Sequence, residues 1–364
     1  MRFIGNKARL LVYMHEILKS HDALVGDRFF DFFAGTGNVG KYFKELGYHV
    51  TASDILYFSY VLQEAYIGNT GEPRFRKLLE HLADQPEVPK RLAQGASGGY
   101  EAVIGYLNSL PGVEGFIYNN YTPEGTAAQR YVRMFFTGEN GKRIDAVRQA
   151  IEDWRERKLI NNHEYFVLLA SVVESVPFYA NISGVYAAYL KSYDPRAKKR
   201  FRLRAIDLSS KGPVGKAYCR NSMELLEKID TDILYLDPPY NARQYAPNYH
   251  LLETIARYDN PVIKGVAGIR PYAEQRSEFC NPVTAIKALS EIAARAKYKV
   301  LVLSYNSEGI MPQKAIMDAL SDRGEVQLYE VDYRRYKSNS KGEAHTSKKT
   351  HIQEQLYVLR PRHL

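Results

Sequence analysis

The sequence predicts an α/β fold whose mostly parallel sheet is interrupted by a long, largely helical insertion. Three observations lead to this expectation. A strand, a glycine-rich turn, a helix and a second strand follow one another between Asp27 and Asp54, as at the start of a parallel sheet. A later apolar strand stops at Asp237-Pro238-Pro239-Tyr240. Between these stretches, from Tyr57 to about Ala217, the pattern is mostly helical and irregular.

The elements near the start follow from their apolar periodicity. Apolar residues at helical spacing predict the first helix, and two apolar runs separated by a glycine turn and a short helix predict the first two strands. Gly47 closes the short helix. The predicted elements are a helix over 8–19, a strand over 27–33, a helix over 41–46 and a strand over 48–53.

The domain division follows from where strand patterns stop and resume. We expect residues 1–56 and 217–364 to form one discontinuous catalytic domain, and residues 57–216 to form an insertion that contains a helix from Ile144 to Lys158. Sheet patterning resumes after the insertion. The later predicted elements are strands at 217–220, 232–236, 299–305, 326–333 and 351–359, and a helix over 285–296.

Composition limits the class of protein. The chain has 364 residues, 45% hydrophobic and 25% charged residues, which is typical of a soluble globular protein. No long apolar stretch predicts a membrane helix, and the first residues lack the apolar core of a signal peptide. The two cysteines, Cys219 and Cys280, form neither a disulfide framework nor a zinc set, so we expect a cytoplasmic protein without a catalytic metal. The net charge of +9 and 29 tyrosines favour a polyanionic partner over simple basic solubility.

The glycine turn from Phe33 to Gly40 allows close backbone approach to a ligand. It lacks the Gly-Lys-Ser/Thr ending of a phosphate-binding loop, which disfavours a nucleoside triphosphatase. Alone, the turn is equally consistent with simple turn geometry. Asp54, at the end of the next strand, either accepts hydrogen bonds from ribose hydroxyls or caps the helix that follows.

The corner at Asp237 is a poor way to continue a strand, but it presents groups that can bind a ligand. Two prolines remove two backbone donors and end the strand, leaving a carboxylate, free carbonyls and the ring of Tyr240 at its carboxyl end. Ligands of α/β proteins bind at that edge. A planar base with an amino group fits it, because the acid and a carbonyl accept N–H bonds while the ring stacks on the base.

Together these motifs resemble the Dam-like, alpha-group DNA adenine methyltransferases. The resemblance rests on four stretches in the order of that group, Arg2–Lys7, Asp31–Gly37, Ala52–Ile55 and Asp237–Tyr240. The segment Gly184–Lys191 is similar to restriction-modification members.

Two departures accompany this resemblance. Phe3 stands where some members have tryptophan. The stretch Cys219–Glu224 lacks an acid often found before the catalytic motif, which affects the adenine-side contacts of the cofactor.

The resemblance implies a Rossmann-like methyltransferase domain that uses S-adenosylmethionine, with a target-recognition insertion. It implies that Asp237 and the carbonyl of Pro238 accept the amino hydrogens of a flipped-out adenine, while Tyr240 stacks on that base. The implied catalytic residues are Asp237, Pro238, Pro239 and Tyr240. The implied cofactor-binding residues are Phe3, Lys7, Asp31, Phe33, Gly35, Gly37, Asp54 and Asn221.

Basic residues are expected to contact phosphates and set affinity rather than sequence choice. Any one of them is equally consistent with a solvated surface. The expected contacts are Lys191, Lys198, Lys199, Arg200, Arg334, Arg335 and Lys337. The implied partners are double-stranded DNA and a cognate restriction endonuclease that acts on the same site, with no membrane.

Three alternatives stay open. An adenine methyltransferase of ribosomal RNA can carry the same four stretches, although the long insertion favours duplex DNA. Transfer to cytosine more often accompanies serine at the position of Asp237. A non-catalytic nucleic-acid-binding protein of the same fold is disfavoured by the intact motifs, and an Asp237→Ala variant separates it from an enzyme.

Overall fold

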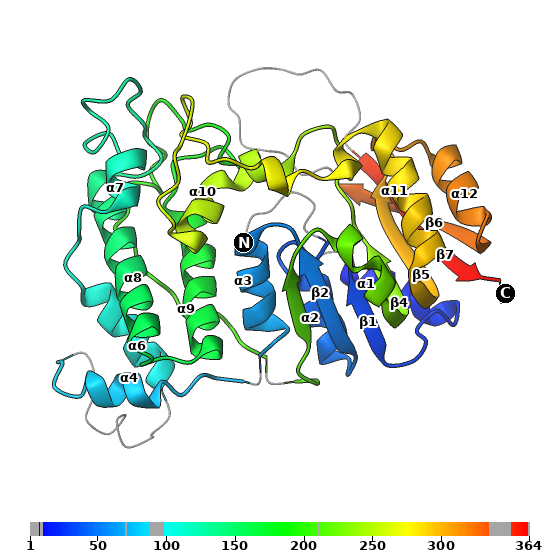
Figure 1. The fold of residues 1–364 in the computed structure, drawn as a ribbon, viewed down its shortest axis with the longest axis horizontal. Coiled ribbons are helices and arrows are strands. Elements are labelled where there is room, and N and C mark those ends of the chain that lie inside the picture. The colour runs from blue at the N-terminus through cyan, green and yellow to red at the C-terminus, as the bar shows by residue number, and fades with distance from the viewer. Residues whose placement is uncertain are drawn as a thin grey trace. The chain divides into compact units, whose positions relative to one another are not determined.

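The computed structural model of the chain describes Lys7 and residues 10–69, 71–86, 98–209, 211–334 and 351–362, without the side chains of 332–334 and 351–352. The described residues form two compact units (Figure 1). The sheet unit contains the residues up to Gln63, Lys211–Ala246 and the residues from Ala273 onward, and the helical unit contains Glu64–Ser210 and Pro247–Tyr272. Residues 57–63 thus pack with the sheet and 247–272 with the helices, whereas the sequence analysis divides the chain at 57 and 216.

The expected mixed α/β fold is confirmed by a seven-stranded sheet of order β3-β2-β1-β4-β5-β7-β6. The first five strands in this order are parallel, and β7 pairs antiparallel with both β5 and β6. The strands are β1 (Arg28–Asp31), β2 (His49–Asp54), β3 (Lys216–Cys219), β4 (Asp230–Leu236), β5 (Lys297–Asn306), β6 (Gly324–Arg334) and β7 (His351–Pro361).

Side-chain alternation gives the sheet two apolar faces. Phe30, Leu234 and Leu301 are paired across β1, β4 and β5, and they belong to the core beneath α11 and α12. Figure 1 shows these two helices lying across that face. On the other face, Phe29 stacks on Phe43 of α2 with ring centroids 3.9 Å apart. Burial on both faces explains why the central strands are nearly continuous apolar runs.

The helices of the sheet unit follow the predicted pattern. The helix expected over 8–19 is described as α1, which begins at Leu11, and Pro282 begins α11 behind the N-cap Asn281. The α-helices are α1 (Leu11–Ser20), α2 (Asn38–Glu45), α3 (Tyr57–Tyr66, which ends in the helical unit), α11 (Pro282–Arg295) and α12 (Gln313–Ser321). The 3₁₀ turns are η2 (Ser222–Lys228), η3 (Ala273–Gln275) and η4 (Glu278–Cys280).

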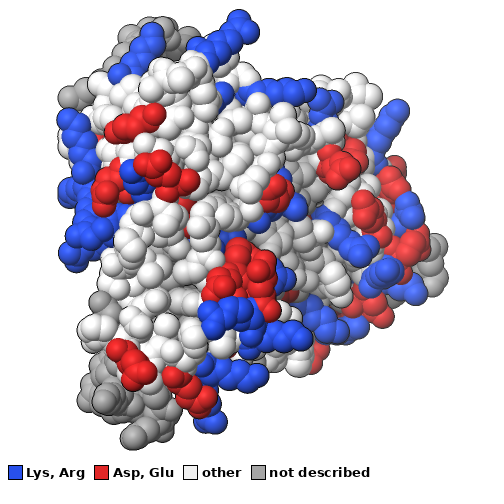
Figure 2. All heavy atoms as spheres, turned by 60° about the vertical axis from the view of Figure 1, so that its left-hand side comes forward, with Lys and Arg blue, Asp and Glu red and all other residues white. Residues whose placement is uncertain are grey.

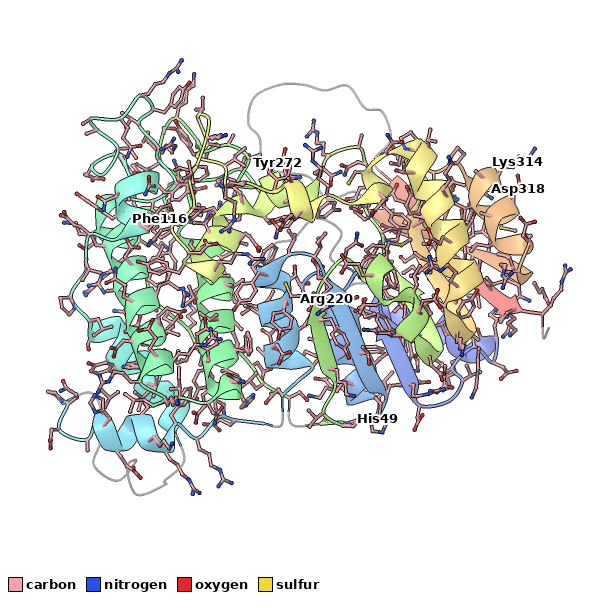
Figure 3. The ribbon with its side chains drawn as sticks, viewed as in Figure 1. His49, Phe116, Arg220, Tyr272, Lys314 and Asp318 are labelled. Carbon is pink, nitrogen blue, oxygen red and sulfur yellow. The ribbon has the colours of Figure 1, made fainter. Side chains whose placement is uncertain are left out.

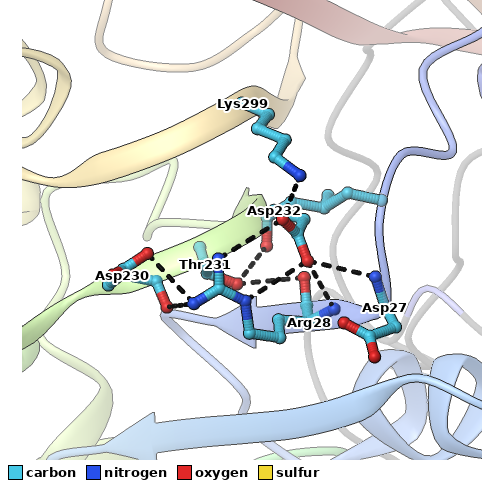
Figure 4. A network of polar contacts seen from close by, with 7 residues as sticks. Asp27, Arg28, Asp230, Thr231, Asp232 and Lys299 are labelled. Atoms are coloured by element: carbon cyan, nitrogen blue, oxygen red, sulfur yellow. Dashed lines mark hydrogen bonds and ion pairs between the residues drawn. The ribbon is translucent and has the colours of Figure 1, made fainter.

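At the amino edge of the sheet, Asp232 joins three strands (Figure 4). Its carboxylate accepts hydrogen bonds from the backbone N–H groups of Asp27 (3.0 Å) and Arg28 (2.9 Å), and pairs with Lys299 Nζ at 2.9 Å. Gly26 lies against it with φ +61°, where an added Cβ would approach Asp232 Cγ to 2.2 Å. This edge is therefore fixed by one carboxylate, away from the carboxyl edge. In Figure 3, His49 marks the amino end of β2 and Arg220 lies just beyond the carboxyl end of β3.

The helical unit is built around two long helices, α8 (Gly138–Glu156) and α9 (Asn162–Ser175), and α8 includes most of the helix expected over 144–158. Arg148 of α8 is fully buried and donates from Nε to the carbonyl of Ile255 at 2.7 Å, which ties the end of α10 to α8. The remaining elements are α4 (Arg76–His81), α6 (Gly99–Ser109), α7 (Phe116–Tyr121), η1 (Val176–Phe178) and α10 (Tyr245–Arg257, which begins in the sheet unit).

A buried carboxylate explains why the short helix α7 forms. Asp145 of α8 accepts hydrogen bonds from the N–H groups of Ile117 (2.9 Å) and Tyr118 (2.8 Å), two of the donors that a helix start leaves unpaired. Within the part of the chain that the structure describes, none of the helices combines the length and apolarity needed to cross a membrane.

Candidate active site at the carboxyl edge of the sheet

The glycine turn follows β1 and begins α2. Gly35 and Gly37 have φ values of +51° and +74°, a left-handed conformation that strains residues with a side chain. Gly37 is also the N-cap of α2. The expected tight turn is thus confirmed, and its backbone lies at the edge where ligands of parallel sheets bind.

Asp54, the last residue of β2, braces this turn. Its Oδ2 accepts a hydrogen bond of 2.9 Å from the Gly35 N–H, and its Oδ1 accepts one of 2.8 Å from the Leu56 N–H. Because α3 begins at Tyr57, Asp54 orients the segment that leads into this helix and does not cap a helix beginning at Ile55.

Asp31, the last residue of β1, is a buried acid with an unused oxygen. Its side chain is 1% exposed, and Oδ2 accepts from the Gly40 N–H at 3.1 Å. Among the described residues, Oδ1 has no hydrogen-bond partner. Burial, together with the nearby negative charges of Asp237 and Asp54, raises the pKa of Asp31 to about 8. A positively charged ligand group would reverse this effect.

The Asp237 corner stands directly after β4, as expected. Tyr240 is half-buried against the core under α11, and its carbonyl accepts a hydrogen bond of 3.1 Å from the Ile310 N–H. This bond links the corner to the loop after β5. Because β2, β1 and β4 are neighbours, Asp54, Asp31 and Asp237 stand at the ends of three adjacent strands.

Lys7 supplies the cation nearest to Asp237. Its Nζ lies 3.4 Å from Asp237 Oδ1 and 2.9 Å from Glu354 Oε2. The pKa of Asp237 is raised to about 7, because burial and the charge of Glu354 raise it more than Lys7 lowers it. Burial lowers the pKa of Lys7, but the charges of Asp237 and Glu354 more than offset this, so Lys7 is firmly cationic.

Glu354 of β7 is a site residue that the sequence analysis does not predict. It lies 347 positions from Lys7 and belongs to no motif. Its only sequence signal is a charged residue inside an apolar strand pattern, and the β5–β7 pairing is needed to place it beside the corner.

Comparison with known proteins decides the family. The family model of the D12 class N6 adenine-specific DNA methyltransferase matches residues 3–319. The chain belongs to this family. The expected resemblance to adenine-specific DNA methyltransferases is confirmed.

Similar proteins include type II methyltransferase M.FokI from Planomicrobium okeanokoites, 39% identical over 350 residues that cover 94% of this chain and 51% of M.FokI. Modification methylase StsI from Streptococcus sanguinis is 33% identical over 365 residues, covering 99% of this chain and 52% of StsI. Type II methyltransferase M.NlaIII from Neisseria lactamica is 36% identical over 363 residues, covering 99% of each chain. The chain thus spans about half the length of M.FokI and StsI, and nearly all of M.NlaIII.

Asn221 and Phe33, which the resemblance assigns to the cofactor site, both contact other residues of the sheet unit. Asn221 caps η2, because its Oδ1 accepts from the Met223 N–H at 3.1 Å, and its Nδ2 donates to Glu278 at 3.3 Å. Phe33 meets Phe279 edge-on, with ring centroids 5.0 Å apart, at the border of the core. Their expected role in cofactor binding stays a prediction.

In this member of the D12 family, two asparagine amides hold the basic segment 197–206 within the helical unit. Asn140 of α8 accepts from the Phe201 N–H at 2.7 Å and donates to the carbonyls of Ala197 and Lys199. Asn108 of α6 pairs with both backbone groups of Leu203, at 2.8 and 2.9 Å. The segment is therefore fixed although it forms no helix or strand.

Along this part of segment 197–206, side chains alternate between buried and exposed positions. Phe201 and Leu203 are each 2% exposed, whereas Arg200, Arg202 and Arg204 are exposed. Lys191, Lys198 and Lys199 are exposed as well. Figure 2 shows Lys and Arg interspersed with Asp and Glu on the face that it presents.

The other residues that are expected to contact DNA or cofactor have no described side chain. The backbone of Arg334 ends β6, without a described side chain. Phe3, Arg335 and Lys337 lie outside the described residues.

Proposed function

We propose that this chain transfers a methyl group from S-adenosylmethionine to the N6 amino group of a flipped-out adenine in double-stranded DNA. The observation that carries the proposal is the partly buried Asp237 corner at the end of β4, with Lys7 at 3.4 Å and two further carboxylates at the ends of β1 and β2. Membership of an N6 adenine-specific DNA methyltransferase family supports the same reaction.

The acids at the sheet edge fit this cofactor. S-adenosylmethionine carries positive charge on its sulfur and amino group, and when bound it supplies an electrophilic methyl group. Asp31 offers a buried oxygen without a partner among the described residues, and Asp54, at the carboxyl end of the next strand, stands where an acid accepts hydrogen bonds from ribose hydroxyls. Gly35 and Gly37 allow close backbone approach, and Lys7, Phe33, Asn221 and Phe3 complete the proposed set.

Asp237 and Pro238 would prepare the adenine. The exocyclic nitrogen shares its lone pair with the ring, so hydrogen bonds to the Asp237 carboxylate and the Pro238 carbonyl favour the tetrahedral geometry that attack requires. The nitrogen gains a methyl group and loses one proton. A carboxyl group whose pKa burial raises to about 7 can accept that proton near neutral pH. Pro239 fixes the corner and Tyr240 stacks on the base.

The basic segment 197–206 is the part of the helical unit that we assign to DNA. Arg200, Arg202 and Arg204 project from a backbone that the amides of Asn140 and Asn108 hold in place, so little ordering is needed when they meet phosphates. Three further exposed cations add positive charge in or near this segment: Lys191, Lys198 and Lys199. Contacts with DNA phosphates are also proposed for Arg334, Arg335 and Lys337. Residues 57–216 are proposed to read the target sequence.

The relatives named as type II methyltransferases support a place in a restriction-modification system. The proposed partner is a restriction endonuclease that cuts the same DNA site, and the proposed location is the cytoplasm. Ribosomal RNA as the acceptor is the other outcome that the assay must distinguish.

The test is to incubate the chain with S-adenosylmethionine carrying a labelled methyl group, mixed DNA and ribosomal RNA, and to map methylated adenines. We expect label on DNA adenine. The Asp237→Ala variant should lose transfer while keeping binding of DNA and cofactor, and Asp318→Ala on α12 is the matched control. Label in RNA alone, or normal transfer by Asp237→Ala, contradicts the proposal.

A further inference from the structure

Glu354 and Asp237 share one cation at the carboxyl edge of the sheet. Lys7 Nζ is 2.9 Å from Glu354 and 3.4 Å from Asp237, so the ammonium group lies closer to the residue without an expected role. The three side chains are 5%, 13% and 17% exposed for Lys7, Glu354 and Asp237. Such enclosed charges must be paired, because leaving one unpaired is costly.

The sharing of the Lys7 ammonium group between Glu354 and Asp237 affects how accessible and how basic the Asp237 carboxylate is. An ammonium group bound to Asp237 alone would occupy the oxygen that the adenine amino group needs, and would make the carboxylate a weaker base. Glu354 binds the ammonium group at the shorter distance, and its own charge offsets that of Lys7. Asp237 then keeps both a neighbouring cation and an accessible oxygen.

We propose that Glu354 is a positioning residue that holds Lys7 beside Asp237 and leaves the Asp237 carboxylate free to accept the amino hydrogens of adenine. This inference rests on the proposed methyl transfer. Glu354 acts through Lys7 and does not itself contact the base.

A charge-neutral variant tests this role. In Glu354→Gln, Lys7 loses one partner and moves toward Asp237. The pKa of Asp237 should fall, because Glu354 raises it and Lys7 lowers it. Asp31, Tyr235 and Tyr240 are further titratable groups whose pKa the charge of Asp237 raises, and the charge of Glu354 also raises the pKa of the two tyrosines.

We expect Glu354→Gln to reduce kcat by about tenfold to a hundredfold, the usual cost of misplacing a catalytic group, with a small effect on the KM for DNA. The acid limb of the pH–rate profile should shift to lower pH. Glu354→Asp keeps the charge and should recover part of the rate. Glu325→Gln, an exposed carboxylate on β6, is the control and should match the parent chain.

A second measurement does not depend on activity. Titration of the Asp237 carboxyl group, followed by carbon NMR in the folded parent chain and in Glu354→Gln, should show the lower pKa in the variant. Equal kcat and equal pKa in the two proteins would overturn the role of Glu354. If the parent chain transfers no methyl group, the proposed function fails, whereas the titration still decides whether Glu354 controls the charge at Asp237.

Discussion

The carboxylate of Asp54 accepts a 2.9 Å hydrogen bond from the backbone N–H of Gly35. This bond ties the end of β2 to the glycine turn after β1, and a second bond from Leu56 orients the segment before α3. The acid thus shapes the turn that we assign to the cofactor. Its structural and functional roles depend on the same two oxygens.

Asp54→Ala should therefore weaken S-adenosylmethionine binding by at least about tenfold, since it removes both the brace and an acceptor worth more than 1.4 kcal/mol. Isothermal calorimetry measures the affinity, and thermal unfolding monitors the fold. Asp318→Ala, an exposed carboxylate on α12 (Figure 3), should bind as the parent does. Undiminished affinity in the Asp54 variant would remove the acid from the cofactor site.

The sheet and its ligand edge could be predicted from the sequence because their signals are local. The apolar run before Asp237 and the glycines at 35 and 37 each specify a strand end within a few residues. Parallel neighbours then bring those ends together, so Asp31, Asp54 and Asp237 meet at one edge without further information.

Residues placed by long-range pairing could not be predicted. Glu354 contacts Lys7 because β7 pairs antiparallel with β5, and no local sequence pattern predicts this pairing. Asn108 and Asn140 look like ordinary polar positions on helices, yet they are hydrogen-bonded to a segment that follows by more than 50 residues. The packing of 247–257 with α8 depends in the same way on the buried Arg148.

Lys7→Met should move the acid limb of kcat/KM to higher pH. Asp237 can take up the proton released from the amino group only when it is ionised, so activity is lost as pH falls through its pKa, and Lys7 keeps that pKa lower than it would otherwise be. At a pH below the acid limbs of both the parent chain and the variant, each unit by which the pKa of Asp237 rises reduces the rate about tenfold. Pre-steady-state methyl transfer between pH 5 and 9 measures the limb. A shift to lower pH, the direction expected for Glu354→Gln, would contradict the assigned role of Lys7.

Asp232→Asn should destabilise the sheet unit at neutral pH. Burial alone raises the pKa of Asp232, but bonds from Lys299, Arg28 and the backbone hold it well below its usual value. The lowered pKa stabilises the fold above the unfolded value of about 3.9, and this contribution is lost as pH falls through the folded pKa. Urea unfolding at pH 7 should show a loss of about 2 kcal/mol.

The matched control is Asp230→Asn on the same strand, because Asp230 is exposed and pairs with Arg28 at 3.1 Å. It should change the free energy of unfolding much less than Asp232→Asn does. The difference between the two variants should shrink below pH 3. Equal stability of both variants at pH 7 would mean that the Asp232 network does not hold the amino edge together.

Replacing Arg200 and Arg202 with glutamine should weaken DNA binding to a similar degree for every sequence. These side chains are exposed on a backbone fixed by Asn140, so the variant removes charge without disturbing the segment. Each lost phosphate contact should reduce the slope of log K against log salt concentration by about 0.9. Fluorescence anisotropy with cognate and unrelated duplexes measures both the affinity and the salt slope. The salt concentration is varied from about 50 to about 200 mM, a range that includes physiological ionic strength. Arg157 and Lys158, exposed at the end of α8, give a control pair with the same loss of charge. If the control pair reduces the slope as much as Arg200 and Arg202 do, the effect is one of net charge and segment 197–206 does not contact the DNA backbone.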